Sequence, residues 1–262
     1  MNYIVIPAYQ PDNKLIKLIE KIHEKSDFRI LVIDDGSSSK CQNIFDKAEQ
    51  YATVLRHQVN QGKGQALKTA FAYIQQQNSY GTVVTADADG QHKIWDILRT
   101  ANKASENPNK LILGVRAFTG KVPLRSRFGN SLTKALFKLQ TGVGVTDTQT
   151  GLRAFTTNLI PFMLKIEGNR YEYEMNMLLE ASKEYQILEV PIETVYINDN
   201  EGSHFRPIRD GLMIYKNIFK FALSSLSSFV VDYLVYAIAI LFLPTAPTSF
   251  RIFLANGLAR VT

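Results

Sequence analysis

The stretch YIVIPAYQPDNKLIKLIEKIHEKSDFRILVIDDGSS, residues 3–38, decides the fold class of this chain. Two short apolar runs within it, Tyr3–Ile6 and Ile30–Ile33, are rich in β-branched residues and typical of buried strands. Between these runs, apolar residues recur at the spacing of one helix face: Leu15, Ile16, Leu18, Ile19 and Ile22. A strand, an amphipathic helix and a second strand in succession predict part of a parallel sheet.

The same alternation continues beyond residue 38. Strands are predicted at Thr53–Leu55, Thr82–Thr85 and Leu111–Gly114, and a second amphipathic helix covers residues 66–74. This pattern predicts an α/β fold with a mostly parallel central sheet and helices on both faces. Such folds bind ligands at the carboxyl ends of their strands. The polar clusters that follow the predicted strands are Pro7-Ala8-Tyr9, Asp34-Asp35-Gly36-Ser37, Asp87-Ala88-Asp89-Gly90-Gln91 and Arg116.

Composition excludes several classes of protein. The 262 residues are 45% hydrophobic and 21% charged, which is ordinary for a folded chain and excludes a disordered or low-complexity one. Cys41 is the single cysteine, so the chain has no internal disulfide and no cysteine-rich zinc module. The net charge of +6 comes without a Lys/Arg-rich run interleaved with aromatic residues. We therefore expect an anionic membrane surface, and no nucleic acid, as the partner of this charge.

The C-terminal region differs from the rest in hydropathy. Residues 221–243, FALSSLSSFVVDYLVYAIAILFL, carry Asp232 as their only charged group and are long enough to cross the roughly 30 Å hydrocarbon core of a bilayer as a helix. A buried core helix is the alternative, although a globular helix of this length normally shows a polar stripe. Residues 250–262 begin a second apolar segment, too short to span, so the chain is expected to stop inside a second span. Basic residues before the first span predict that the preceding domain faces the cytoplasm: Arg206, Arg209, Lys216 and Lys220.

The pair Asp87-x-Asp89 follows a predicted strand and has the chemistry of a cation site. Two carboxylates one residue apart can both reach a hard divalent ion, and Gln91 can add a carbonyl oxygen. Acidic pairs in surface turns are common, and this is the alternative interpretation. The position at a strand end, beside other polar strand ends, favours the metal site.

Two other clusters suit a nucleotide. A carboxylate of Asp34-Asp35-Gly36-Ser37 can accept a hydrogen bond from a base, or Asp35 or Ser37 can close a turn. Lys63 lies where Asn60-Gln61-Gly62-Lys63-Gly64 opens a helix, a place that favours phosphate. This segment lacks the first glycine of a P-loop, and Gly142-Val143-Gly144 lacks the third glycine of a dinucleotide fingerprint. Of the histidines, His23 and His57 are expected at the surface.

Eight motifs follow one another along the chain: IPAYQP (6–11), VIDDGSS (32–38), NQGKGQAL (60–67), DADGQH (87–92), GVR (114–116), RFGN (127–130), DTQTGLRAF (147–155) and RYEYEMNML (170–178). In sequence and order they resemble those of family 2 glycosyltransferases with the GT-A fold, most of all the dolichyl- or polyprenyl-phosphate sugar synthases. The resemblance covers about the first 210 residues. The apolar tail resembles the start of a GtrA-type membrane domain.

The resemblance implies a domain organisation and a set of site residues. Residues 1–205 would form the GT-A domain, 206–220 a juxtamembrane amphipathic helix and 221–262 an incomplete GtrA-like region. Mg²⁺ or Mn²⁺ would be held by Asp87, Asp89 and Gln91. The nucleotide-sugar would lie against Pro7, Ala8, Tyr9, Asp34, Asp35, Gly36, Lys63, Asp87 and Ala88. The acceptor phosphate would lie against Arg116 and Arg127. Ser203 and Arg206, which precede the apolar stretch, are also expected at this phosphate, and the alternative is that their segment is a juxtamembrane amphipathic anchor. Gln10-Pro11 departs from the Asn-Glu usual after the tyrosine, which affects the base contact at that edge.

The expected reaction is an inverting, metal-dependent transfer of a sugar from a nucleotide-sugar to polyprenyl (undecaprenyl) phosphate, for surface polysaccharide glycosylation. UDP-glucose is the favoured donor. Asp89, Asp147, Arg116 and Arg127 are the predicted catalytic residues. A phosphate nucleophile is already an oxyanion, so the site needs positive charge and no strong base. Asp147 would orient an arginine or the sugar, or would simply be a turn residue. Arg153, taken singly, is expected in a surface ion pair.

Two other functions stay open on the sequence alone. The acceptor would be a polysaccharide or a teichoic acid in one of them, although the Arg-Trp pair of processive family members is missing. The protein would be a lipid-carrier translocator or scaffold with an inactive transferase domain in the other, against which the intact Asp87-x-Asp89 speaks. Membrane helices would also allow the chain to associate with copies of itself.

Overall fold

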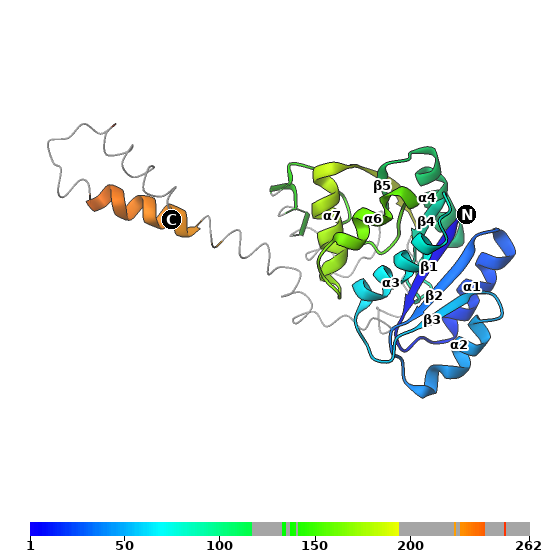
Figure 1. Ribbon diagram of the computed structural model, residues 1–262. Coiled ribbons are helices and arrows are strands. Elements are labelled where there is room, and N and C mark those ends of the chain that lie inside the picture. The colour runs from blue at the N-terminus through cyan, green and yellow to red at the C-terminus, as the bar shows by residue number, and fades with distance from the viewer. Residues whose placement is uncertain are drawn as a thin grey trace. The chain divides into compact units, whose positions relative to one another are not determined.

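The computed structural model divides the chain into two compact units, Met1–Phe205 and Arg206–Thr262, and each is described by itself (Figure 1). The described residues are 1–116, 133–134, 137–139, 141–193, 223, 226–238 and 249.

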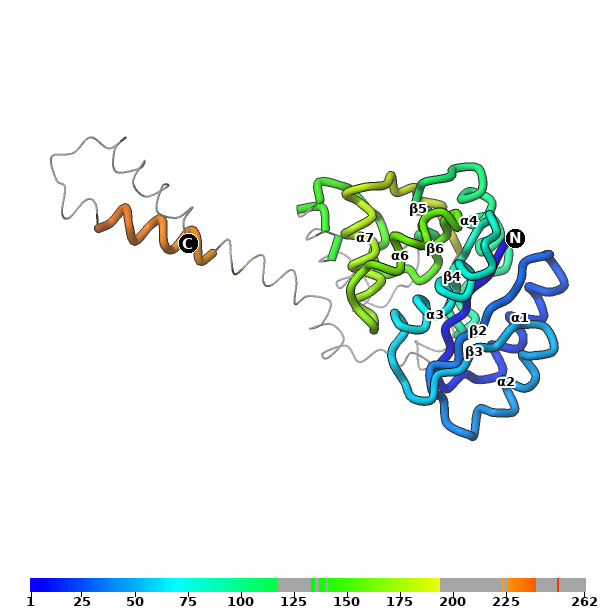
Figure 2. Tube along the Cα trace, in the orientation of Figure 1, coloured from blue at the N-terminus to red at the C-terminus, as the bar shows by residue number. Residues whose placement is uncertain are grey.

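The first unit is built on a seven-stranded sheet with the strand order β3-β2-β1-β4-β6-β5-β7. β1 lies between β2 and β4 (Figure 1), and in Figure 2 it is the dark blue trace that starts near the N-terminus. All strand pairs are parallel except those that β6 makes with β4 and β5. The predicted α/β fold with a mostly parallel sheet is therefore confirmed. The strands are β1 (Tyr3–Ala8), β2 (Arg29–Asp34), β3 (Thr53–Arg56), β4 (Thr82–Thr85), β5 (Lys110–Arg116), β6 (Arg153–Thr156) and β7 (Gln186–Ile192).

Helices cover both faces of this sheet. Because side chains alternate along a strand, Ile4 and Val32 join one core with α1, α2 and α4. On the other face α3 packs on β1 and β2, and its Phe71 meets Phe155 of β6 edge to face at 5.3 Å between ring centres. The helices are α1 (Asn13–Lys25), α2 (Gln42–Ala48), α3 (Lys63–Gln76), α4 (Ile94–Glu106), α6 (Ile160–Lys165) and α7 (Glu172–Glu184), with 3₁₀ turns at Ser39–Cys41 and Thr157–Leu159.

Local sequence explains where the first helix begins and which face it buries. The Oδ1 atom of Asp12 accepts a hydrogen bond from the backbone N–H of Lys14 at 2.8 Å, which caps the free end of α1. The buried residues of α1 are the five apolar ones that the spacing singled out: Leu15, Ile16, Leu18, Ile19 and Ile22.

In the second unit, residues 226–238 are helical. Their large apolar side chains are exposed to the surroundings. Among the described helices of the whole chain, none combines the length and the apolarity that a bilayer span requires. Most of the predicted membrane region, including residues 239–243 and 250–262, lies outside the described residues. The exposed residues of the helix are Leu226, Phe229, Val230, Tyr233, Leu234 and Ile238.

Candidate active site

The polar clusters predicted at the strand ends meet at one edge of the sheet. β1, β2, β4 and β5 run in the same direction, so their carboxyl ends share this edge, and the antiparallel β6 begins there with Arg153 opposite Thr85. The loops after β2 and β4 supply the Asp35 and Asp87 side chains, and Arg116 is the last residue of β5. Ligand sites of open α/β sheets lie at this edge.

Lys63 joins three elements at the centre of this edge. Its Nζ atom lies 2.7 Å from Oδ1 of Asp87, in the loop after β4, and 2.9 Å from Oε2 of Glu174, in the first turn of α7. The other oxygen of Asp87 lies 3.3 Å from Nε2 of His92. Burial alone would raise the pKa of Asp87, but Lys63 and His92 together hold the pKa of this carboxyl well below its usual value. Asp87 is therefore an anion at neutral pH.

The start of α3 is fixed in place, which determines where the Lys63 side chain begins. Gly62 has φ +104°, a conformation that favours glycine, and an added Cβ atom would lie 2.4 Å from the carbonyl oxygen of Asn169. A Cβ atom on Gly64 would lie 2.5 Å from the Cβ of Tyr173. The backbone N–H of Gln65 donates to the Asn169 carbonyl at 2.8 Å. Both glycines thus allow α3 to approach the segment that leads into α7.

Asp89 is the acid of the predicted metal pair whose negative charge is less well balanced by its surroundings. Its Oδ1 atom accepts a hydrogen bond from the backbone N–H of Gln91 at 3.0 Å. Burial, and then the negative charge of Asp87, raise the pKa of Asp89. Two nearby carboxylates, one of which disfavours the ionisation of the other, have the chemistry of a hard cation site. Ala88, between them, packs against the hydrophobic core and so fixes the loop.

The metal set is small within the described part of the chain. There, no group of three or more His, Cys, Asp or Glu side chains is arranged to hold an ion. A cation bound at Asp87 and Asp89 would therefore complete its shell with water, an amide carbonyl or the oxygens of a ligand, as Mg²⁺ commonly does. The residues fit such an ion by oxygen chemistry and by charge.

Asp35 holds the loop that precedes α3. The residue is 3% exposed. Its carboxylate accepts hydrogen bonds from the backbone N–H groups of Gln61 and Gly62 and from the side-chain amide of Asn60, all at 2.8–2.9 Å. Its Oδ1 atom also lies 2.8 Å from Nδ1 of His57. The structure thus places the Asp35 carboxylate against this loop; a contact with a base stays a prediction.

The expectation that His57 lies at the surface was wrong. Its side chain is 7% exposed, because one ring nitrogen meets Asp35 and the other lies 2.9 Å from Oγ1 of Thr69 on α3. His23 is exposed, as expected.

Asp34 closes the turn after β2. Its Oδ1 atom accepts from the backbone N–H of Ser37 at 2.9 Å, so Asp34, and not Asp35 or Ser37, makes the turn bond that the sequence suggested. Gly36 has φ +70°, and an added Cβ atom would lie 2.3 Å from the Val59 carbonyl carbon, so a side chain does not fit.

Gln10 links the end of β1 to the same turn. Its backbone N–H donates to Oγ of Ser37 at 2.9 Å, and its side-chain oxygen accepts from Oγ of Ser38 at 2.9 Å. Gln10 has φ +51°, and the preceding Tyr9 is 39% exposed. Gln10 therefore connects the Pro7–Tyr9 segment to the turn that follows β2.

Arg116 and Asp147 form an ion pair at the end of β5. Nε of Arg116 lies 2.6 Å from Oδ2 of Asp147, and its Nη2 lies 3.0 Å from Oδ1. The Asp147 side chain is fully buried, whereas that of Arg116 is 21% exposed. The remaining predicted acceptor residues, Arg127, Ser203 and Arg206, lie outside the described residues.

Arg153 is buried, so the expected surface ion pair was wrong. The residue is 1% exposed at the start of β6, with its Nε donating to the Thr150 carbonyl at 3.0 Å and its Nη1 to the Glu174 carbonyl. Its Nη2 has no hydrogen-bond partner among the described residues. Burial lowers the pKa of Arg153, while the charges of Glu174, Asp147 and Asp87 oppose this.

Sequence reasoning missed Glu174, His92 and Asn60 as members of the site. Each lies inside a motif that was singled out, namely RYEYEMNML, DADGQH and NQGKGQAL. Glu174 is also in the first turn of α7, where an acidic residue is ordinary, so the sequence offered no separate sign of its contact with Lys63.

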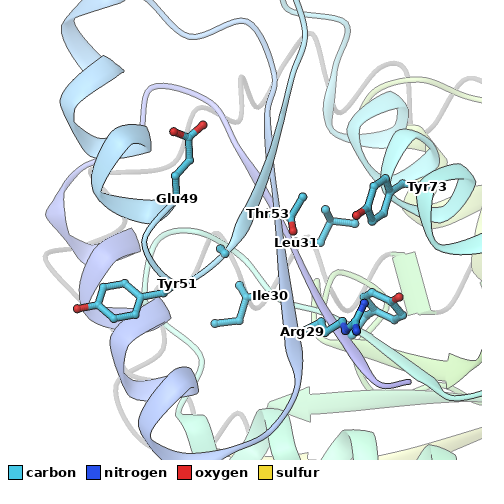
Figure 3. Close-up of a pocket in the computed structure, with 9 residues that line it drawn as sticks. Arg29, Ile30, Leu31, Glu49, Tyr51, Thr53 and Tyr73 are labelled. Carbon is cyan, nitrogen blue, oxygen red and sulfur yellow. The ribbon is translucent and has the colours of Figure 1, made fainter. Parts of the chain in front are cut away.

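A pocket of about 330 Å³ lies at the opposite edge of the sheet (Figure 3). Its lining includes Tyr3, Arg29 and Thr53, which are the first residues of β1, β2 and β3. No predicted site residue lines it. We therefore assign the site to the charged edge, because parallel sheets bind ligands at the carboxyl ends of their strands.

Comparison with known proteins agrees with this arrangement. The family model of glycosyl transferase family 2 matches residues 3–163. The UDP-N-acetylglucosamine–dolichyl-phosphate N-acetylglucosaminyltransferase of Methanococcus voltae is 27% identical over 215 residues, covering 74% of this chain and 85% of that protein. The dolichyl-phosphate β-glucosyltransferase of Saccharomyces cerevisiae is 26% identical over 249 residues, covering 82% and 72%.

Solved structures share the fold. Glucosyl-3-phosphoglycerate synthase from Mycobacterium tuberculosis, solved with Mn²⁺, uridine diphosphate and phosphoglyceric acid, superposes with a TM-score of 0.63 at 17% identity, covering 86% of this chain and 78% of that one. The α/β fold is GT-A-like. The matched segment covers more than half of the chain and includes the Asp35, Lys63 and Asp87 loops, so the protein belongs to glycosyl transferase family 2 and is a glycosyltransferase.

Proposed function

We propose that the protein transfers a sugar from a nucleotide-sugar to polyprenyl phosphate, with inversion at the sugar and with a divalent metal ion. The observation that carries this proposal is the pair of acids Asp87 and Asp89 beside Lys63, at the sheet edge that also holds Arg116. The relatives from M. voltae and S. cerevisiae, which bear the names of dolichyl-phosphate sugar transferases, support the lipid phosphate acceptor.

Asp89, Asp87 and the carbonyl of Gln91 would hold Mg²⁺ or Mn²⁺. Such an ion, when bound, neutralises the charge that develops on a leaving nucleoside diphosphate. Asp89 suits such an ion because burial and the neighbouring Asp87 disfavour its negative charge, which a cation would balance. Lys63 supplies a further positive charge within reach of the donor phosphates. The Mn²⁺ and uridine diphosphate named for the M. tuberculosis enzyme are consistent with this assignment.

The nucleotide would lie along the ends of β1 and β2. The exposed ring of Tyr9, with Pro7 and Ala8, offers a surface for the base, and the turn Asp34–Gly36 offers backbone groups beside it. The Asp35 carboxylate accepts three hydrogen bonds from the Asn60–Gly62 loop. Asp35 would therefore support nucleotide binding by holding this loop in place, in addition to any contact that it makes with the base. UDP-glucose is our favoured donor.

Arg116 would bind the acceptor phosphate together with Arg127, Ser203 and Arg206. Asp147 fixes the direction of the Arg116 guanidinium by two hydrogen bonds, which suits an orienting role better than that of a base. Because a phosphate monoester is already an oxyanion at neutral pH, the attack on the sugar carbon needs no proton acceptor. A single displacement of this kind inverts the configuration of that carbon.

The reaction would take place at the cytoplasmic face of the cell membrane. The exposed apolar side chains of the helix at 226–238, and the net charge of +6, suit a lipid environment with an anionic surface. We place the domain boundaries at 1–205, 206–220 and 221–262, with the last segment as a GtrA-like membrane region that also allows self-association.

A reconstituted assay tests the proposal. The purified full chain in liposomes with undecaprenyl phosphate, Mn²⁺ and radiolabelled UDP-glucose is expected to produce a label that extracts into organic solvent. UDP-N-acetylglucosamine and GDP-mannose, assayed in parallel, identify the donor. Asp89→Asn is expected to remove the product, whereas Asp46→Asn, at an exposed position of α2, is expected to retain it. A fully active Asp89→Asn protein would contradict the metal site, and label that appears only in a water-soluble polymer would contradict the lipid acceptor.

A further inference from the structure

Lys63 occupies an oxygen that the proposed metal needs. Its Nζ atom lies 2.7 Å from Oδ1 of Asp87, whose other oxygen is 3.3 Å from His92. Asp87 therefore has a cationic or hydrogen-bonding partner on both oxygens while the nearby Asp89 bonds to a backbone N–H. In this arrangement the lysine does for Asp87 what a metal ion would do, which is to neutralise it.

Lys63 also has a second anionic partner on a different element. Glu174 of α7 lies 2.9 Å from the same Nζ atom, and its side chain is 13% exposed. An ammonium group carries three hydrogens and bonds as a point charge, so it can keep one carboxylate while it releases the other. The two carboxylates thus share one cation.

We propose that Lys63 is a resident counter-ion of Asp87 that competes with the divalent metal, and that it is released to Glu174 and the donor diphosphate when the metal binds. This inference rests on the proposed function, because it takes the metal and donor sites from there. Glu174 is a positioning residue in this scheme, since it acts through Lys63 and holds the ammonium near the site after Asp87 has been given up.

The surrounding structure confines this change to one side chain. The start of α3 is packed against the segment before α7 through Gly62 and Gly64, and the Gln65 N–H is bonded to the Asn169 carbonyl. The Lys63 backbone is therefore fixed, and its flexible four-carbon stem provides the movement of the ammonium. Asp87 faces a positive charge both before and after the change, because one cation replaces another.

Binding of Mn²⁺ alone to the full chain, followed by electron paramagnetic resonance of the free ion, tests the competition without any turnover. Lys63→Met is expected to tighten the binding of Mn²⁺ about tenfold, the effect of removing a competitor worth about 1.4 kcal/mol. Lys63→Arg, which keeps a cation at the site, is expected to stay within about twofold of the wild type. With uridine diphosphate present, Lys63→Met is expected to weaken nucleotide binding, because the diphosphate loses its partner.

Lys68→Met provides a matched control for the loss of charge. Lys68 lies on the same helix, with its Nζ atom 5.1 Å from the centre of the Tyr173 ring, and the acids that act on its charge are Glu172 and Glu167, neither of which belongs to the predicted metal pair. This variant is expected to leave Mn²⁺ affinity unchanged. A tightening equal to that of Lys63→Met would show that the general charge of the domain, and not competition at Asp87, is responsible, and would overturn the proposal.

A double-mutant cycle separates a shared cation from simple electrostatic attraction. Glu174→Gln leaves Lys63 to Asp87 alone and is expected to weaken Mn²⁺ binding severalfold. In a Lys63→Met background the same Glu174→Gln change is expected to have almost no effect, because its effect passes through Lys63. Equal effects of Glu174→Gln in both backgrounds would contradict the proposal.

The outcomes distinguish this inference from the proposed function. Saturable Mn²⁺ binding that Asp89→Asn abolishes, but that Lys63→Met leaves unchanged or weakens, overturns the competition and leaves the metal site standing. A wild-type chain that binds no Mn²⁺, even with uridine diphosphate, overturns the metal site of the proposed function and the competition with it. Circular dichroism of each variant verifies that it is folded.

Discussion

The guanidinium of Arg116 and the buried carboxylate of Asp147 meet through two hydrogen bonds, of 2.6 Å and 3.0 Å, across 31 residues of chain. Asp147 also accepts a hydrogen bond from the backbone N–H of Gln149 at 3.0 Å. Its own turn therefore holds the carboxylate in place, and the carboxylate holds the arginine. The pair joins the end of β5 to the DTQTGLRAF segment that leads into β6. It gives a partly exposed arginine one direction at the sheet edge.

We expect Asp147→Asn to lower both stability and acceptor binding. The amide keeps the shape but removes the charge, which costs about 2 kcal/mol of unfolding free energy when a buried, charge-assisted hydrogen bond is lost. Denaturant unfolding measures this cost. The KM for polyprenyl phosphate is expected to rise more than the KM for the nucleotide-sugar. An equal rise in both values would argue against an orienting role toward the acceptor.

Asp89→Asn is expected to separate activity from stability. In the presence of EDTA the variant should be at least as stable as the wild type at neutral pH, because burial and Asp87 raise the pKa of Asp89 and so disfavour its charge in the folded state. A group with a raised pKa stabilises the fold at low pH and loses this contribution as the pH rises through the folded pKa. The advantage of the variant should therefore grow with pH. Melting curves in EDTA between acid and neutral pH measure it, and a variant less stable than the wild type throughout would contradict this account.

The neighbouring acids Asp34 and Asp35 are expected to differ sharply in their tolerance of an amide. Asp35→Asn places its NH₂ group against the backbone N–H of either Gln61 or Gly62, which donate to different oxygens of Asp35, and should cost about 3 kcal/mol, because a buried donor is left unsatisfied. Asp34→Asn retains an oxygen for the Ser37 N–H and should cost about 1 kcal/mol or less. Urea midpoints of the two variants provide the comparison. Similar midpoints would mean that the Asn60–Gly62 loop does not depend on Asp35.

Gly64→Ala is expected to disturb the start of α3. Its new Cβ atom would lie 2.5 Å from the Cβ of Tyr173 and 2.9 Å from the Arg170 carbonyl oxygen, so the two segments must separate. Such overpacking costs about 1–3 kcal/mol, and the shift should also move Lys63 and reduce nucleotide binding. Gly144→Ala is the control, since its Cβ atom would meet nothing within 4 Å. Stability equal to that of the wild type in both variants would show that the contact between α3 and α7 is loose.

Much of the sheet followed from sequence pattern. The five strands from β1 to β5 were predicted within a few residues, because each is a short apolar run. β6 and β7 were not predicted. β6 has four residues and carries a buried arginine, and β7 contains Glu189 and Pro191, so neither shows the apolar run or alternation on which strand prediction depends.

The sequence also indicated the chemistry of the site, because reactive residues follow predicted strands and the direction of parallel strands brings those ends together. The sequence did not indicate which of the charged side chains form ion pairs or hydrogen bonds with one another. His57 and Arg153 were expected at the surface, yet both are buried, since each has a polar partner in another segment, Asp35 for His57 and the Glu174 carbonyl for Arg153.

The sequence by itself determined the strand–helix alternation, the family and the acids at the strand ends, because these depend on local periodicity and on short spacings along the chain. Only the tertiary structure decided that Lys63 lies between Asp87 and Glu174, 24 and 111 residues away. The physical reason is that an ion pair depends on distance in space, and this distance is set by the packing of α3 against α7 and by the strand order, neither of which is written in any one segment.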